Sequence, residues 1–425
     1  MAQLARSKFL ALRFAEEVTF HVEAFLQGTL ELFSNTHLTV YSCLAGQDVR
    51  LDADEIRWLA TLPESQWMPL DEARPDGFPD DERFHELLRL GVVILDPKNA
   101  EGEEDGAENE SFVMPDGAQA MLELHREVAS IPWHPTTLHT HMVNQDHEHG
   151  NAGKAEPLDL VTKNQDAEAS ADKFLDKWGD PPPAFYEAPD AGPPIPLSLG
   201  HREGNLYDAL HTRRTRRAFD DSRPMDPDHL ATLLRYTFGC LGRHPLSPRF
   251  FSLHKGSPSG GSLHPIEAYP VLRNVDGFET GFYHYDTRRH ALRLLAPMAE
   301  DELRERMTRL AMGQVFAAEA HVAVFLVARY QRNFWKYRER INTFNVILKD
   351  AGHLSQTFQL VATDLGLSAF YTGAIDPPEI LKSLGYERFE DRFHHGPIGI
   401  LGTGHPPTDD QTLMPYEPYD PMDAR

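Results

Sequence analysis

The loop Gly256-Ser257-Pro258-Ser259-Gly260-Gly261-Ser262-Leu263-His264-Pro265 leads directly into an apolar segment, residues 266–272. Its glycines and small hydroxyl residues would let the backbone lie flat against a planar ligand, because they carry little side-chain bulk. The backbone N–H groups of Ser259, Gly260 and Gly261 could then face the edge of that ligand. Pro-Ser-Gly-Gly would also make an ordinary turn without any ligand. The loop alone leaves both interpretations open.

A run with four arginines in five residues precedes this loop: Arg213-Arg214-Thr215-Arg216-Arg217. Guanidinium groups bind phosphate oxygens in pairs and neutralise their charge, and a hydroxyl adds a further hydrogen bond. A solvated basic face is the alternative, but the chain as a whole is acidic, with 41 Lys and Arg against 65 Asp and Glu. A flat loop and a phosphate site in one domain together predict a site for flavin mononucleotide (FMN).

From residue 197 onward, helical and strand patterns alternate. The strand pattern at 321–328 is almost entirely apolar, which predicts burial on both faces. The segment 333–365 has helical periodicity, as one long helix or as two with a break. We therefore expect an α+β domain, with further helices at 206–214, 229–238 and 298–312 and further strands at 266–272, 281–285, 366–373 and 397–402.

Lys336 and Tyr337 stand side by side early in that long helical segment. An amine and a phenol can exchange protons with a substrate when burial or a neighbouring charge moves their pKa values towards neutrality. Arg332, Arg338 and Arg340 nearby fit a simple charged helix face equally well. Position in the sequence does not decide between these alternatives.

The first 98 residues form a smaller predicted unit. This unit resembles a small winged-helix module, which could bind DNA, bind a peptide by strand addition or cap the next domain. The pattern rests on a strand at 38–44, helices at 52–59 and 82–90, and a last strand at 92–97.

A long connector joins the two predicted domains. It is acidic at its start, rich in histidine in the middle and rich in proline at its end. His134, His139, His141, His147 and His149 include two i, i+2 pairs, but a flexible polar segment fixes no metal geometry, so we expect no metal site. The predicted boundaries are 1–98 for the winged-helix-like unit, 99–196 for the connector, 197–410 for the α+β domain and 411–425 for a tail.

The composition argues against several classes of protein. A net charge of −24 argues against nucleic-acid and anionic-membrane binding. Two cysteines, Cys43 and Cys240, support neither a disulfide framework nor a cysteine zinc site. No apolar run reaches membrane-spanning length, and the first residues lack the apolar stretch of a secretion signal. We therefore expect a cytoplasmic protein.

The order of the motifs resembles one family. Arg-Arg-Thr-x-Arg, Pro-Ser-Gly-Gly-x-Leu-x-Pro, Gly-Phe-Tyr-His-Tyr-Asp, Lys-Tyr, Ala-Gly-His-x-x-Gln and Gly-Leu follow one another between residues 197 and 405. This order is similar to that of the SagB-type branch of the nitroreductase-like flavoproteins, the azoline dehydrogenases that mature ribosomally made peptides. The resemblance implies a nitroreductase-like α+β domain with FMN at a homodimer interface, preceded by a module that binds the leader of a precursor peptide.

The resemblance also implies roles for individual residues. Lys336 and Tyr337 occupy the place of the family's catalytic pair. Two positions depart from the family, since Thr215 stands where a serine is usual and His264 where a tyrosine is common. The implied FMN-binding residues are Arg213, Arg214, Thr215 and Arg217 at the phosphate, Pro258, Ser259, Gly260 and Gly261 along the isoalloxazine, and His353, Gln356 and Gly373 nearby.

The implied reaction is the two-electron dehydrogenation of a thiazoline or oxazoline to an azole, with Lys336 or Tyr337 as the base. A precursor peptide and a cyclase or other maturation enzyme are the expected partners. One alternative is an NAD(P)H-fed reductase of nitroaromatics, quinones or dehydroamino acids, because fold does not fix function. A second is a peptide-binding scaffold with an inert flavin domain. A DNA-binding regulator is disfavoured because residues 52–95 are acidic.

Overall fold

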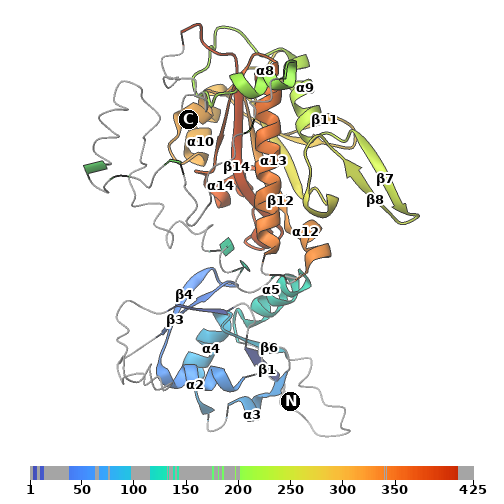
Figure 1. The fold of residues 1–425 in the computed structure, drawn as a ribbon. Coiled ribbons are helices and arrows are strands. Elements are labelled where there is room, and N and C mark those ends of the chain that lie inside the picture. The colour runs from blue at the N-terminus through green and yellow to red at the C-terminus, as the bar shows by residue number, and fades with distance from the viewer. Residues whose placement is uncertain are drawn as a thin grey trace. The chain divides into compact units, whose positions relative to one another are not determined.

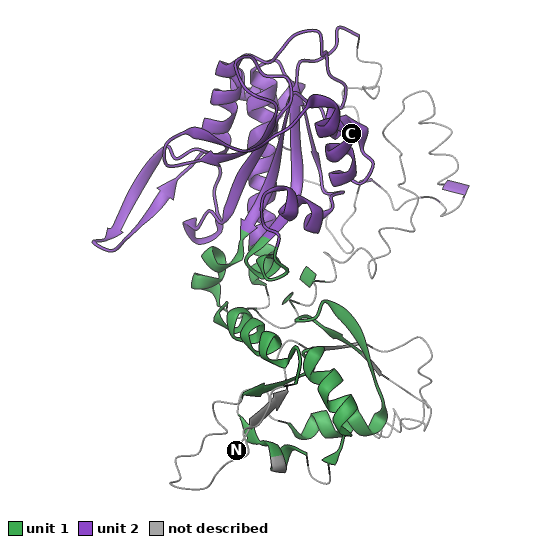
Figure 2. Cartoon of the chain, turned by 180° about the vertical axis from the view of Figure 1, so that it is seen from behind, with its two compact units in different colours: residues 1–152, 329–346, 388–395 green, residues 153–328, 347–387, 396–425 purple. Residues whose placement is uncertain are grey.

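The chain forms two compact units, coloured green and purple in Figure 2. Unit 1 contains residues 1–152 and two later pieces, 329–346 and 388–395; unit 2 contains 153–328, 347–387 and 396–425. The structure is a computed structural model. It describes residues 3–6, 10–13, 38–62, 67–74, 77–96, 115–131, 133, 137–138, 141–142, 175–176, 180, 184–185, 197, 202–338, 340 and 342–409.

Unit 2 is built on a six-stranded sheet in the order β11-β10-β9-β12-β14-β13. Strands β12 and β14 of this sheet are labelled in Figure 1, beside helix α13. In the middle, β9 and β12 are antiparallel, with Ile266 opposite Ala328. At one edge, β13 is antiparallel to β14, with Ser368 opposite Gly404. The strands are β9 (Ile266–Leu272), β10 (Gly281–Asp286), β11 (Ala291–Pro297), β12 (Val322–Arg329), β13 (Ser368–Thr372) and β14 (His395–Gly404).

The core of unit 2 surrounds β12. Every residue from Val322 to Ala328 is buried, so the prediction that this strand is covered on both faces is confirmed. Phe325 packs with Met307 and Phe316 in the main apolar cluster. The helices are α8 (Asn205–Thr212), α9 (Pro227–Phe238), α10 (Glu300–Leu310), α11 (Val315–Glu319), α13 (Thr343–Asp364) and α14 (Pro377–Ser383).

The predicted α+β architecture of this half is confirmed, and the helical segment 333–365 proves to be two helices. Helix α12 (Tyr330–Tyr337) ends where Arg338 takes a left-handed backbone, φ 52° and ψ −144°, which residues with a Cβ rarely adopt. The Arg338 N–H closes the helix by donating to the carbonyl of Phe334 at 2.8 Å. The buried Asn333 amide donates to the carbonyl of Thr343 at 3.1 Å and ties the start of α13 to α12.

Unit 1 contains two small sheets and several short helices. The Asp52 carboxylate caps α2 by accepting the N–H groups of Asp54 and Glu55. Trp58 and Phe84 pack in its core. One sheet contains β5 (Met68–Pro69), β1 (Gln3–Arg6) and β6 (Val93–Asp96), and the other β2 (Leu10–Arg13), β3 (Leu38–Ser42) and β4 (Gln47–Leu51). The helices are α2 (Ala53–Thr61), α3 (Leu70–Ala73), α4 (Asp81–Arg89), α5 (Ala118–Ser130) and α15 (Asp391–His394), besides α12. The strands and helices predicted in this part are present, and the winged-helix function stays a prediction.

None of the helices in the described ranges combines the length and the apolar character needed to cross a bilayer. In those same ranges, no group of three or more His, Cys, Asp or Glu side chains is arranged to hold a metal ion. Of the five histidines considered as metal ligands, His134, His139, His147 and His149 lie outside the described residues.

His141, the fifth, is a structural residue of unit 1. Its ring stacks on Trp133, with centroids 5.2 Å apart, and its Nε2 lies 2.8 Å from the carbonyl oxygen of Arg392. Its Nδ1 lies 3.0 Å from the hydroxyl of Tyr330. Phe334 closes the cluster edge-on against Trp133 at 4.5 Å. The segment around His141 is therefore packed against α12, not a solvated part of the connector.

Burial should make unit 1 sensitive to acid. Desolvation lowers the pKa of His141 to about 4, against the weaker opposing effect of its hydrogen bond to Arg392. A histidine in an unfolded chain has a pKa of ~6.5. The contribution of neutral, buried His141 to the free energy of unfolding is therefore complete above that pH and is lost as the pH falls towards 4. By pH 5 the loss in the free energy of unfolding should be about 2 kcal/mol. Urea unfolding of His141→Gln should lack this loss, whereas His85→Gln, at a half-buried position of α4, should retain it.

Candidate functional site

A buried carboxylate ties the glycine-rich loop to helix α13. Asp350 is 3% exposed and accepts the Ser259 hydroxyl and, at 2.9 Å, the N–H of Gly260. Ser259 Oγ in turn accepts the N–H of His264 at 2.9 Å. The middle of the loop is therefore fixed directly to α13, and its end is fixed to Ser259. The Gly260 N–H, one of the three groups expected to face a planar ligand, donates to Asp350 instead.

The loop contains an unusual number of left-handed residues. Gly261 has φ 61°, Ser262 56° and His264 47°. A left-handed residue with a Cβ costs about 1–3 kcal/mol and persists only where its surroundings determine it, as at ligand sites. Here the His264 Nε2 lies 3.2 Å from the carbonyl oxygen of Leu253. This contact holds the loop together with the hydrogen bonds of Ser259. The loop shape is thus held by specific bonds.

The face of α13 beside this loop is open. Gly352, His353 and Gln356 follow at helical spacing and are all exposed. The His353 Nδ1 lies 3.2 Å from the carbonyl oxygen of Pro258 in the loop. A Cβ at Gly352 would meet no atom within 4 Å. Loop and helix therefore form a continuous exposed surface on which a flat ligand could lie.

The arginine run lies against α13 and β13. Arg213 donates to Oε1 of Gln359 at 3.3 Å, and the backbone N–H of Arg216 donates to the carbonyl of Ala369 in β13 at 2.9 Å. Asp350, at the loop, and Gln359, at the run, are nine residues apart on α13. That spacing is ~14 Å along the helix axis, about two and a half turns, so the loop and the run contact α13 at different heights and on different sides.

The predicted cofactor residues fit FMN in their exposure and chemistry. All eleven lie in unit 2 and are half-buried or exposed, so none is locked into the core. The arginine run supplies guanidinium donors for a phosphate, and the glycine-rich loop supplies small residues for a flat ring system. They are Arg213, Arg214, Thr215, Arg217, Pro258, Ser259, Gly260, Gly261, His353, Gln356 and Gly373.

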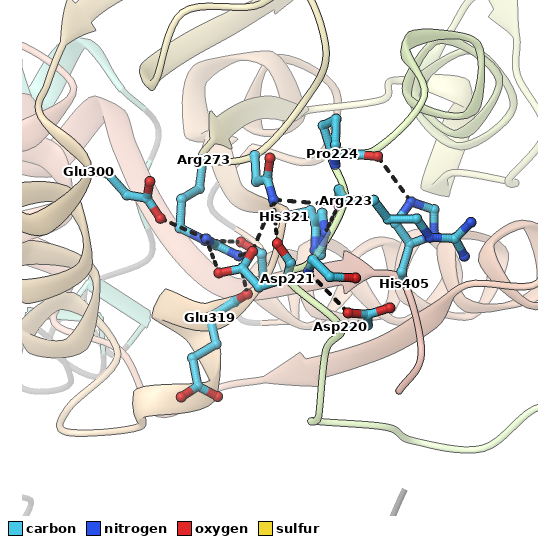
Figure 3. Close-up of polar contacts among 12 residues, drawn as sticks. Asp220, Asp221, Arg223, Pro224, Arg273, Glu300, Glu319, His321 and His405 are labelled. Atoms are coloured by element: carbon cyan, nitrogen blue, oxygen red, sulfur yellow. Dashed lines mark hydrogen bonds and ion pairs between the residues drawn. The ribbon is translucent and has the colours of Figure 1, made fainter. Parts of the chain in front are cut away.

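The segment that follows the arginine run is anchored by Arg273 (Figure 3). This side chain is 6% exposed, and all five of its N–H groups donate. Two go to the Asp221 carboxylate, at 2.6 and 2.8 Å, and one to Glu300 at 2.8 Å. The others go to the carbonyls of Glu319 and Ala320. Burial alone would raise the pKa of Asp221, but the hydrogen bonds from Arg273 and a neighbouring amide hold it well below its usual range.

The same segment is held to the end of β14. The Asp220 N–H donates to the carbonyl of His405 at 2.8 Å. The ring nitrogens of His321 and His405 lie 3.0 and 3.2 Å from the carbonyl oxygens of Arg223 and Pro224, as Figure 3 shows. The arginine run is thus fixed on its carboxyl-terminal side by the sheet, which sets where a bound phosphate would lie.

Lys336 and Tyr337 lie at the end of α12, in unit 1. Lys336 is exposed and Tyr337 half-buried, and the ammonium nitrogen is 5.8 Å from the phenol ring centroid. Tyr330 and Phe334 stand seven and three residues before Tyr337, on the same side of the helix, and are buried among the aromatic residues of unit 1. Lys336 is therefore accessible, whereas Tyr337 lies at the edge of the buried side.

Asp350 was not among the residues predicted from the sequence. It stands one helical turn before His353 of the Ala-Gly-His motif. Its signal was present: Ile347, Ala351 and Leu354 are buried positions of the same helical face. An acidic residue on an otherwise apolar face needs hydrogen-bond partners, and the loop supplies them.

Replacement of Asp350 by alanine should weaken both the loop and cofactor binding. It removes the acceptor of two loop donors, so the left-handed residues lose their support. We expect FMN affinity to fall about 10- to 100-fold, the equivalent of one or two lost hydrogen bonds, as measured by fluorescence titration of the apoprotein. Asp364→Ala, at an exposed position of the same helix, should bind FMN like the wild type. Equal affinity in Asp350→Ala would contradict the positioning role.

Comparison with known proteins agrees with this architecture. The Nitroreductase family matches residues 210–405. The nitroreductase homologue MJ1384 of Methanocaldococcus jannaschii is 30% identical over 187 residues, 44% of this chain and 87% of that protein. The trifolitoxin-processing protein TfxB of Rhizobium leguminosarum bv. trifolii is 33% identical over 135 residues, 31% of this chain and 35% of TfxB.

Among solved structures, the E. coli microcin synthetase McbBCD complex with truncated pro-MccB17 has a similar chain. It shares 19% identity with a TM-score of 0.43, and the match covers 66% of this chain and 97% of that one. The family match and the extent of the similarity to MJ1384 establish the relationship: this chain belongs to the nitroreductase family of oxidoreductases.

Proposed function

We propose that this protein is an FMN-dependent dehydrogenase of the SagB type that matures a ribosomally made peptide, converting an azoline ring to an azole. One observation carries the proposal: the strained loop and the arginine run both bind helix α13, the loop at Asp350 and His353 and the run at Gln359, in a nitroreductase-family chain. The similarity to a trifolitoxin-processing protein supports a peptide substrate.

The chain's residues would hold the cofactor as follows. Arg213, Arg214 and Arg217 would bind the phosphate as guanidinium forks, with Thr215 adding its hydroxyl. The loop Pro258 to Gly261 would support the flat ring system. His353, Gln356 and Gly373 would border it. When bound, FMN supplies a two-electron acceptor for the hydride that the azoline ring loses.

Lys336 or Tyr337 would take the proton from the neighbouring ring carbon. The azoline then loses one hydride and one proton, and the new double bond completes the aromatic azole, so charge and electrons balance. Because aromatisation supplies driving force, the protein mainly has to position the ring and accept the proton. For this role, the base must come within hydrogen-bond distance of the carbon that gives up the proton, about 2.6–3.2 Å between heavy atoms.

The partners follow from this activity. A precursor peptide would bind through its leader to the N-terminal module of residues 1–98. A cyclase would supply the azoline, because a ring must be closed before it can be oxidised. A homodimer would complete the FMN site. These partners stay proposals, supported by the peptide-processing role in the name of TfxB.

A reductase fed by NAD(P)H is the second candidate, favoured by the similarity to a nitroreductase homologue over 87% of its length. The visible spectrum of the purified protein, recorded without oxygen before and after addition of NADPH, separates the two. A yellow protein that NADPH leaves oxidised, but that an azoline-containing peptide bleaches, would support the dehydrogenase. Rapid bleaching by NADPH would support the reductase. A colourless protein that takes up no FMN would contradict both.

A further inference from the structure

Strand β11 lies at one edge of the six-stranded sheet and is labelled in Figure 1. Within the ranges that the structure describes, it pairs with β10 alone, from Ala291 opposite Asp286 to Pro297 opposite Gly281. In an edge strand, alternate residues point their N–H and C=O groups away from the sheet, where those groups can pair with another chain. β11 therefore presents a row of backbone donors and acceptors to one more strand.

The side chains of β11 are exposed on both faces of the sheet. Five of its seven residues are exposed and two are half-buried, whereas five of the six residues of the neighbouring β10 are buried. Leu294 and Leu295 are 41% and 43% exposed. Because successive side chains of an added strand point to opposite faces, such a strand could pack on either side of this edge.

The surroundings of β11 are basic. Residues 287–297 contain Arg288, Arg289 and Arg293 and no acidic residue, whereas the whole chain has a net charge of −24. Arg289 and Arg293 each donate to the Asp286 carboxylate, at 2.9 and 2.8 Å, and their side chains are still 61% and 59% exposed. A guanidinium carries five donors, so both arginines keep donors for a second carboxylate. Acidic side chains therefore match this edge.

Only part of the edge is regular. The register shifts between Phe282 and Tyr283 of β10, which leaves Leu295 as an extra residue of β11. Pro297 ends the strand without a backbone donor. A bulge and a proline both hinder further pairing. An added strand would therefore pair along residues 291–294, next to the arginines.

The basic charge disfavours two other occupants of this edge. A second copy of β11 would bring the same arginines together, and like charges on paired strands are destabilising. A nucleic acid would be repelled by the net charge of the chain. An extended acidic peptide has both the complementary charge and the backbone groups that strand addition needs.

We propose that β11 binds an acidic, extended segment of the precursor peptide by strand addition. The inference rests on the proposed function, which makes a peptide the substrate, and deepens it by naming where and by which chemistry unit 2 holds that peptide. Main-chain pairing supplies affinity, and the arginines select carboxylate side chains. Unit 2 also contains the predicted cofactor residues, so the peptide and the flavin would be held by the same unit.

Fluorescence anisotropy of a labelled peptide mixed with the full-length protein tests the proposal. The probe is a capped peptide of seven residues, the length of β11, in which glutamate and valine alternate. We expect a dissociation constant below about 100 μM. A fully N-methylated version keeps the charges but has no backbone donors, and it should bind at least about 10-fold more weakly. A version with lysine in place of glutamate should not bind.

Variants of the protein separate this edge from the rest of the surface. Arg288→Glu with Leu294→Glu should weaken binding of the acidic probe at least about 10-fold, because it replaces a basic and an apolar contact with repelling carboxylates. The matched control is Arg309→Glu with Val315→Glu, which makes the same change in charge at exposed positions of α10 and α11. It should bind like the wild type.

Amide hydrogen exchange shows where the probe binds. Residues 291–297 of the wild type should exchange more slowly when the acidic probe is present. Four outcomes would each overturn the proposal: no binding, equal binding of the N-methylated probe, wild-type affinity in the β11 variant, or protection confined to residues 1–98. Both measurements report binding without any flavin chemistry, so a failed spectral test of the proposed function leaves them interpretable.

Discussion

Replacing Arg273 with methionine is expected to lower the free energy of unfolding of unit 2 by about 3 kcal/mol, the range for breaking a buried ion pair. The substitution keeps the length of the side chain but removes all five donors. The carbonyls of Glu319 and Ala320 then lose their partner inside the protein. The Asp221 and Glu300 side chains are 43% and 50% exposed and can regain water, which holds the loss near the lower end of that range. Urea unfolding of the full chain measures it.

Arg304 provides the matched control, because it contacts the same two carboxylates. Its side chain is 33% exposed, so Arg304→Met should reduce stability by less than about 1 kcal/mol, as exposed ion pairs do. FMN affinity should fall in Arg273→Met and not in Arg304→Met, since Arg273 anchors the segment after the arginine run. If both substitutions lowered the free energy of unfolding equally, the five hydrogen bonds of Arg273 would contribute no more to stability than the exposed ion pairs of Arg304.

Lys336→Met and Tyr337→Phe should separate the base from its neighbour. If one of the two accepts the proton, its replacement should lower the rate of azoline oxidation about 10²- to 10⁴-fold, the usual contribution of a general base. Single-turnover bleaching of the flavin by the peptide substrate without oxygen measures this step directly. FMN content should stay unchanged, because neither residue is among the predicted cofactor ligands.

Lys382→Met is the control for loss of a lysine, since Lys382 lies exposed on α14 beside Glu379. It should oxidise the peptide at the wild-type rate. Should Lys336→Met and Tyr337→Phe both keep that rate, proton removal belongs to another group, and the pair is part of a charged helix face, the alternative that the sequence left open.

The sequence predicts best where one local effect dominates. Strand β12 is apolar throughout and its burial follows directly, and Asp52 with Glu55 specifies the start of α2 by capping. The end of α12 depends on the left-handed Arg338. No periodicity encodes that conformation, so the pattern allowed one helix or two.

Long-range contacts set what the sequence could not specify. Asp350 gains its role from Ser259, about ninety positions away in the chain, and periodicity marks its helical face but not its partners. His141 looks polar within a histidine-rich stretch, yet it is buried because Trp133 and Tyr330 enclose it. The two-stranded sheet of β7 (Gly242–Ser247) and β8 (Phe250–His254) escaped prediction because prolines interrupt its alternation.

The order in which the chain is synthesised matters for unit 1. Its aromatic cluster joins Trp133 to Phe334, and the carbonyls of Arg392 and Phe393 complete it. A ribosome must therefore translate nearly the whole protein before the first-made unit can close. Until then, Trp133 lacks these partners. A gene fragment that ends at residue 152 encodes an unfinished unit, so the module has to be studied within the intact chain.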